Sequence, residues 1–256
     1  GSVVCVTRSQ ACYVWSPREE GRSLLTTWLG LLWGLAQGVR HALEPDHLAA
    51  LSTLVADRRT PRSAASYAVA WGAGHSLMLL AVSGVFVLVR AHMPDRVAAS
   101  FELAVAVMLV ALGTGALRRA IGAGRSGPAA EHAHAFATHA HAGPPDHVHL
   151  RNITLARRPL IVGCVHGLAG SGALTALVLS QTKSTVLALA CIAIYGGGSA
   201  LGMATLAGLA GVPLARLRRT PRGVPTLLIA TGTLSLGLGL AWGWSAGNAI
   251  LGTFRT

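Results

Sequence analysis

Residues 40–47 of this chain read Arg40-His41-Ala42-Leu43-Glu44-Pro45-Asp46-His47, inside an otherwise apolar run. They place five ionisable groups and one proline within eight residues. An ionisable group at membrane depth costs about 3 kcal/mol or more, so such groups are usually functional. We therefore expect an ion-binding site here if the run lies in a membrane.

The composition indicates a membrane protein. The 256 residues are 52% hydrophobic and 12% charged, with a mean hydropathy of +0.53, whereas soluble domains contain about 25% charged residues. The 31 glycines suit close helix packing in lipid. The net charge of +12 would suit nucleic acid, but the arginines cluster between apolar segments and only 5% of residues are aromatic. We expect the lipid bilayer, and no nucleic acid, as a partner.

Six apolar segments have the length of about 20 residues that a membrane-spanning helix needs. They cover residues 24–56, 65–90, 97–118, 158–181, 184–211 and 222–251. The sequence therefore predicts an all-α polytopic membrane protein with six transmembrane helices. The first segment is longer than one span requires. It fits either a helix broken at Pro45 or a span followed by a re-entrant piece.

Most Lys and Arg residues outside these segments lie in the loops after the first, third and fifth segments. Cytoplasmic loops are enriched in Lys and Arg, so we expect these loops in the cytoplasm and both termini outside the cell inner (cytoplasmic) membrane. The predicted parts are an extracytoplasmic tail (1–23), a three-helix unit (24–118), a cytoplasmic linker (119–157) and a second three-helix unit (158–251).

The two three-helix units resemble each other. Three pairs of segments match in the same order and at a nearly constant offset: 41–51 with 166–176, 71–77 with 195–201, and 112–115 with 236–239. A repeat with an odd number of helices puts its copies in opposite membrane orientations. The sequence thus predicts two inverted repeats whose site lies near the bilayer midplane, between them.

The opening stretch contains the residue types of a metal site. His41 and His47 are about 240° apart around an ideal helix, so a straight helix would not bring them together. Pro45 disrupts the hydrogen bond to the carbonyl of His41. A break there can direct His41, Asp46 and His47 into one cavity.

His75 in the second apolar segment and His166 in the fourth complete the predicted ligands. Imidazole is the commonest transition-metal ligand, and a carboxylate can ligate the ion or orient the ring. A nitrogen-rich set suits Ni(II), Co(II) or Cu(II), while Zn(II) prefers a tetrahedral site. These residues leave the choice of metal open.

The linker between the units is rich in histidine, which binds divalent metals weakly. We expect a metal-buffering loop formed by His132, His134, His139, His141, His147 and His149. Its cytoplasmic side favours an acceptor, buffer or sensor of metal, with a cytoplasmic metallochaperone as a further partner. The alternative is a disordered linker without a role.

The motif Arg40-His41-x4-Asp46-His47 resembles the Arg-His-Ala-x-x-x-Asp-His signature of the nickel/cobalt transporter family. Gly74-His75-Ser76 resembles the family's Gly-His-Ser motif in the following helix. The likeness covers the first two helices well and the remainder in general plan.

The chain departs from the usual pattern of this family at two places. It has Glu44-Pro45 where the family usually has Asp-Ala, and residues 166–172 replace the family's later acidic, threonine-rich motifs. This is similar to the shorter six-helix, urease-accessory-type nickel permease branch. The resemblance implies secondary uptake of Ni(II) or Co(II) as the transported substrate for metalloenzyme assembly, with His41, Asp46, His47 and His75 in recognition.

Other functions remain as alternatives. An exporter of the same fold would use the same residues in the opposite direction. An intramembrane hydrolase would pair Ser171 with His166 or His75, or hold zinc on a His/Asp cluster. However, Ala169-Gly170-Ser171-Gly172 lacks the first glycine of the Gly-x-Ser-Gly pattern of intramembrane serine proteases, and the sequence contains no His-Glu-x-x-His. A membrane chaperone or anchor for a metalloenzyme is the third alternative. We expect no enzyme and, without a nucleotide-binding loop, no nucleotide.

Overall fold

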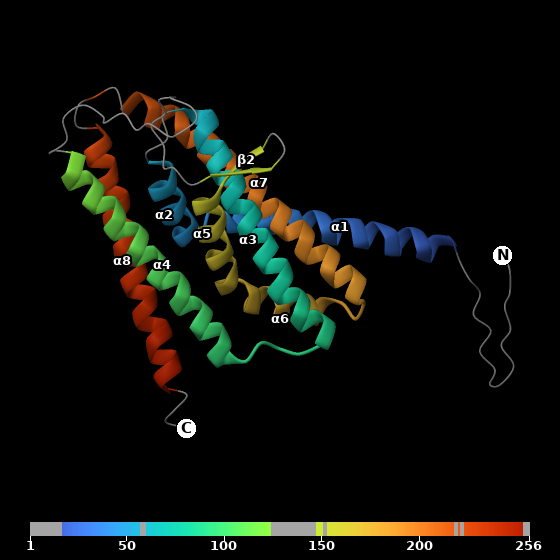
Figure 1. Cartoon of the computed structure of the whole chain (residues 1–256). Coiled ribbons are helices and arrows are strands. Elements are labelled where there is room, and N and C mark those ends of the chain that lie inside the picture. Colours follow the sequence, from blue (N-terminus) through green and yellow to red (C-terminus); the bar gives the residue numbers. More distant parts are fainter. Residues whose placement is uncertain are drawn as a thin grey trace, which may run out of the picture.

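A computed structural model describes residues 17–56, 60–123, 147–150, 153–217, 220 and 223–252. This part of the chain forms eight α-helices and two short strands (Figure 1). In chain order they are α1 (Pro17–His41), α2 (Pro45–Val55), α3 (Pro61–Val89), α4 (Asp95–Ala123), β1 (His147–Leu150), β2 (Ile153–Ala156), α5 (Arg157–Ala169), α6 (Ser171–Gln181), α7 (Thr185–Leu217) and α8 (Gly223–Gly252).

Four helices have the length and apolar character of membrane spans. They are the 28 to 30 residues of Arg62–Val89, Asp95–Gly122, Thr185–Pro213 and Gly223–Gly252 in α3, α4, α7 and α8. Helices α5 and α6 together pass the same criteria but are bent by 53°. The described helices thus account for four or five of the six expected spans. The span expected over residues 24–56 stays a prediction.

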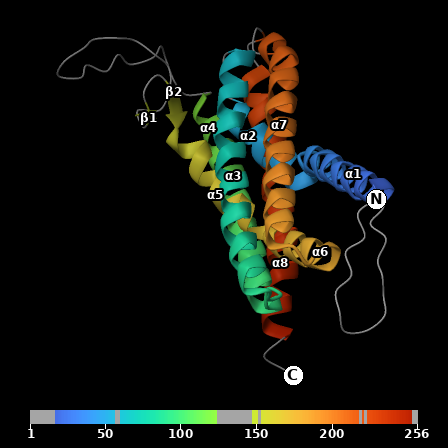
Figure 2. The same cartoon turned by 90° about the vertical axis from the view of Figure 1, so that its right-hand side faces the viewer.

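The long helices pack in pairs, α3 against α7 and α4 against α8. Figure 1 shows α4 running beside α8, and Figures 1 and 2 both show α3 beside α7. Close approach depends on small residues: a Cβ added at Gly113 of α4 would lie 2.7 Å from the carbonyl oxygen of Gly232 in α8. Helix α1 packs along α7 and projects from the bundle, and α5 packs along α3.

The first apolar segment is interrupted at the motif, as the sequence predicted. Helix α1 ends at His41 and α2 begins at Pro45, its first residue. Glu44 is extended (φ −63°, ψ 146°), because a proline disfavours helical geometry in the residue before it. Proline itself is tolerated at a helix start, where its missing N–H would have had no partner.

Helix α2 lies inside the bundle and anchors the core. Its apolar residues pack with side chains from α3, α4 and α7. This cluster includes Ala49, Ala50, Leu51, Leu54, Val55, Trp71, Val105, Leu109 and Met203, all at most 7% exposed. The start of α2, with the motif residues, is therefore fixed in the interior.

Three boundaries differ from the prediction. Helix α1 begins at Pro17, inside the expected tail 1–23, and α4 continues past residue 118 to Ala123. Strands β1 and β2 form an antiparallel hairpin inside the expected linker, so the all-α prediction was incomplete. Polar and apolar residues alternate over His147–Leu150 and again over residues 153–155, which is the period-2 pattern of strands.

Candidate metal centre

The structure brings the five predicted ligands together from four helices. His41 is the last residue of α1, Asp46 and His47 lie in the first turn of α2, His75 lies in α3 and His166 lies in α5. All five side chains are buried, at most 8% exposed. The break before Pro45 makes this possible, since it turns the chain between His41 and Asp46.

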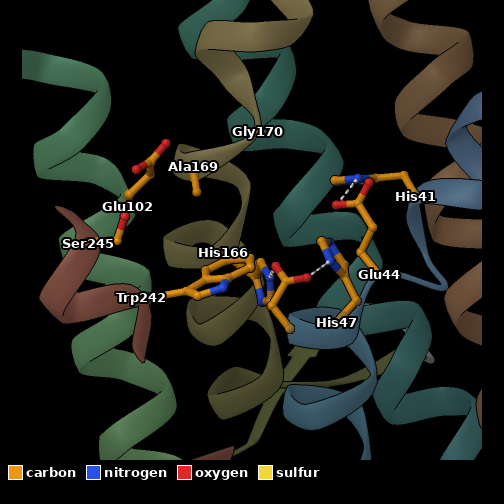
Figure 3. A pocket seen from close by; sticks show the side chains of 10 residues that line it. His41, Glu44, His47, Glu102, His166, Ala169, Gly170, Trp242 and Ser245 are labelled. Carbon is orange, nitrogen blue, oxygen red and sulfur yellow. Dashed lines mark hydrogen bonds and ion pairs between the residues drawn. The ribbon is translucent and has the colours of Figure 1, made fainter. Parts of the chain in front are cut away.

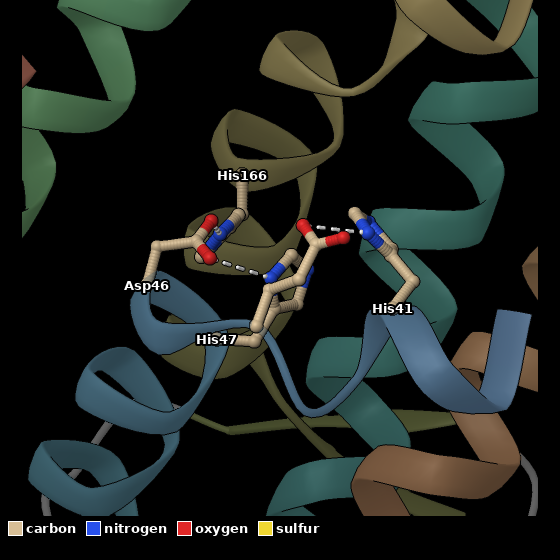
Figure 4. Close-up of polar contacts among 5 residues, drawn as sticks. His41, Asp46, His47 and His166 are labelled. Atoms are coloured by element: carbon tan, nitrogen blue, oxygen red, sulfur yellow. Dashed lines mark hydrogen bonds and ion pairs between the residues drawn. The ribbon is translucent and has the colours of Figure 1, made fainter. Parts of the chain in front are cut away.

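Two carboxylates hold three of the imidazole rings. Asp46 Oδ2 lies 2.7 Å from His166 Nε2, and Asp46 Oδ1 lies 3.2 Å from His47 Nδ1 (Figure 4). Glu44 Oε2 lies 2.9 Å from His41 Nδ1. Carboxylates in such contacts fix the orientation of a ligating ring and raise its basicity.

His47 occupies the centre of the cluster. Its ring centroid lies 4.3 Å from that of His41, 5.0 Å from that of His75 and 4.1 Å from that of His166. Four imidazoles in such contact, inside apolar helices, are costly unless something binds them.

Several ring nitrogens have no hydrogen-bond partner. These buried atoms are His41 Nε2, His47 Nε2, His166 Nδ1 and both nitrogens of His75. A buried polar atom without a partner costs about 1–3 kcal/mol. A divalent cation would accept their lone pairs, so the free nitrogens fit a metal-binding role.

The cluster opens into a cavity of about 260 Å³. Figure 3 shows Glu102 of α4 with Trp242 and Ser245 of α8 on the side opposite His41 and Glu44. These three residues were not among the predicted site residues. Of the three, only Glu102 could have been predicted from the sequence, because a carboxylate within an apolar segment is usually functional.

The donor types and spacing suit a transition metal. Ligand atoms of His41, His47 and His75 lie within 4.8 Å of one another, and so do those of Asp46, His47 and His166. Metal–nitrogen distances of about 2.0–2.1 Å place two ligands of one ion at most about 4.2 Å apart. Imidazole with one carboxylate favours Ni(II), Co(II), Cu(II) or Zn(II) over Mg(II) and Ca(II).

The histidines of the expected buffering loop are described only in part. His132, His134, His139 and His141 lie outside the described residues. His147 and His149 lie on β1, where the structure describes the backbone alone. Their metal-buffering role stays a prediction.

One comparison with known proteins matches most of the chain. The chain is 29% identical over 217 residues to the urease accessory protein UreH of Bacillus sp. (strain TB-90), covering 85% of this chain and 91% of that protein. No family model matches, and no solved structure matches. The match to UreH confirms the resemblance of this chain to the urease-accessory branch that its motif residues indicated.

Proposed function

We propose that this chain is a secondary transporter that carries Ni(II) or Co(II) across the cytoplasmic membrane, in the direction of uptake for metalloenzyme assembly. The observation that carries the proposal is the cluster of His41, Asp46, His47, His75 and His166, buried in apolar helices with unpartnered ring nitrogens. Similarity to a urease accessory protein supports the proposal. A chain of several apolar helices around a cluster of metal-ligating side chains is better suited to carrying an ion across a membrane than to catalysing a reaction.

The proposed architecture is a pair of inverted three-helix repeats, and reciprocal contacts support it. Gly38 of α1 lies against the carbonyl oxygen of Tyr195 in α7. At the corresponding positions of the other half, Gly163 of α5 lies against the carbonyl oxygen of Trp71 in α3. Two halves related by a pseudo-two-fold axis would make the same contact twice.

The α3–α7 pair supports the inversion. A Cβ added at Gly72 would lie 2.9 Å from Cα of Ala200, and one added at Gly196 would lie 3.0 Å from Cβ of Ser76. From Gly72 to Ser76 the residue numbers rise along α3, while those of the contacting residues fall from Ala200 to Gly196 along α7. The two helices are therefore antiparallel. Since α3 and α7 are equivalent in the repeat, their halves would cross the membrane in opposite directions.

In this arrangement His41 and His166 are equivalent residues on the two sides of His47, whereas Asp46 and His47 correspond to Ser171 and Gly172. One ion would then be coordinated unequally by the two halves, near the bilayer midplane. Alternating access would expose this site to each side in turn.

The alternative of a serine hydrolase has little support from the contacts. The hydroxyl of Ser171 donates a hydrogen bond to the carbonyl of Leu168 at 2.6 Å, and His166 contacts Asp46 instead. An exporter uses the same site, so the direction of transport has to be measured.

The test is accumulation of radiolabelled nickel and cobalt by proteoliposomes containing the purified full chain. We expect wild-type vesicles to accumulate metal and His47→Ala vesicles to match empty ones. His92→Ala is the matched control, because His92 is exposed between α3 and α4. Equal accumulation by wild type and His47→Ala would contradict the proposal. Metal accumulation and metal resistance in cells that express the chain would separate import from export.

A further inference from the structure

The five ligands form two overlapping groups of three. One group is His41, His47 and His75, and the other is Asp46, His47 and His166. Within each group the ligand atoms lie within 4.8 Å of one another, and His47 belongs to both. Two ligands of one ion can be at most about 4.2 Å apart at ordinary metal–nitrogen distances. Among the described residues, no set larger than these two groups of three has its ligand atoms this close together, so the arrangement suits one ion in either of two neighbouring positions rather than one ion held by all five residues.

The two positions differ in their access to the cavity. Asp46, His47 and His166 all line it. His41 of the other group lines it as well, whereas His75 does not, and its side chain is fully buried. Both of its ring nitrogens lack hydrogen-bond partners. The Asp46–His47–His166 group is thus the cavity-side position, and the His41–His47–His75 group is the deep position.

The positions also differ in charge. The cavity-side position includes the carboxylate of Asp46, which attracts a hydrated cation and replaces part of its water with an oxygen ligand. The deep position offers three imidazoles as ligands, and the carboxylate beside it, that of Glu44, contacts Nδ1 of His41 and so acts through that ring. Hard cations such as Mg(II) and Ca(II) prefer oxygen ligands, so a move to the deep position would favour ions that accept nitrogen.

From these contacts we infer that the transported ion occupies the two positions in succession, with His47 as the ligand common to both. This inference rests on the proposed transport function and adds a step to it. The cavity-side position captures the ion, and the deep position selects it before it passes to the other side. Loss of a ligand unique to one position should leave the other able to bind.

The test measures metal coordination separately from transport. Purified protein is loaded with one equivalent of Ni(II), and X-ray absorption spectra count the coordinated imidazoles. We expect His75→Ala to bind nickel through two imidazoles and a carboxylate, and His166→Ala to bind it through three imidazoles. His47→Ala should lose stoichiometric binding, because both positions need that ring. His92→Ala should match the wild type.

Transport completes the test. We expect His75→Ala to bind nickel yet carry it at least about 10–100-fold more slowly than wild type in proteoliposomes, because loss of a residue that only orients a ligand already has an effect of this size. His75→Gln, which keeps most of the side-chain volume, is measured beside it, and size-exclusion profiles check that each variant is folded.

Several outcomes would overturn the inference. Identical spectra for His75→Ala and His166→Ala, or loss of binding in either one as complete as in His47→Ala, would mean a single position. If wild-type vesicles still accumulate nickel in that case, the proposed function survives and only the two positions fail. Absence of nickel flux in wild-type vesicles would overturn both.

Discussion

Glu102 is exposed, and its carboxylate lines the same cavity as His47 and His166. It has no hydrogen bond or ion pair to another described residue, so its charge is free to act on ions that enter. A cavity lined by one sign of charge concentrates counter-ions and raises their rate of capture. We expect Glu102→Gln to raise the KM for nickel by about tenfold and to leave kcat unchanged, as measured by initial uptake rates over a range of nickel concentrations.

The matched control is Asp95→Asn, which removes another exposed carboxylate, at the start of the same helix and away from the cavity. Its KM should stay at the wild-type value. Equal shifts in the two variants would mean that general surface charge, and not the cavity, sets the rate of capture.

At the scale of helices, the break between α1 and α2 positions the proposed ligands His41, Asp46 and His47. Glu44 is extended because Pro45 follows it. Pro45→Ala removes this restriction and lets the two helices join, which would rotate His41 away from His47. We expect the affinity for Ni(II) to fall by about 10–100-fold, the range for loss of ligand orientation, in isothermal titration of the purified protein.

Pro61→Ala is the control for that change. Pro61 also lies at the start of a helix, but there the Thr60 side chain caps α3 by accepting a hydrogen bond from the Ser63 N–H at 3.2 Å. The substitution should leave nickel affinity unchanged. A similar loss in both variants would show that helix stability, and not the break, controls binding.

The contact between α1 and α7 depends on Gly38. An added Cβ there would collide with the carbonyl oxygen of Tyr195, whereas one added at Gly34, a turn earlier, would meet nothing within 4 Å. We expect Gly38→Ala to destabilise the protein by about 1–3 kcal/mol, the usual cost of overpacking, and Gly34→Ala to be neutral or slightly stabilising. Thermal unfolding in detergent measures both, and equal midpoints would contradict the packing of α1 on α7.

At the scale of the whole molecule, the sequence predicted those features of the fold and the site that depend on a few individual residues. His41, Asp46, His47, His75 and His166 were predictable because ionisable groups in apolar segments are rare and expensive. The helix break was predictable because proline has a local effect. The ends of α3 and α8 follow from where the apolar runs 65–90 and 222–251 stop, whereas α4 and α7 continue beyond their apolar runs to Ala123 and Leu217.

Other features depend on packing between distant segments, which one sequence does not contain. Trp242 and Ser245 reach the cavity only because α8 packs beside α4. The division of the ligands into two groups follows from how deeply α3 inserts His75. The hairpin was not predicted although its first strand has an alternating pattern, because the many histidines of the linker indicated a metal-buffering loop instead.

The inverted repeat makes a prediction for the whole chain. If α3–α4 and α7–α8 are equivalent but inverted, their connecting loops lie on opposite sides of the membrane. Single cysteines replace His92 and Thr220, which lie in these loops, in a chain whose native cysteines are changed to serine. In intact cells we expect a membrane-impermeant thiol reagent to label His92→Cys and to reach Thr220→Cys only after permeabilisation, because the Arg-rich loop around Thr220 should be cytoplasmic. Labelling of both from the same side would mean parallel repeats and would remove the basis for alternating access around a two-fold axis in the membrane plane.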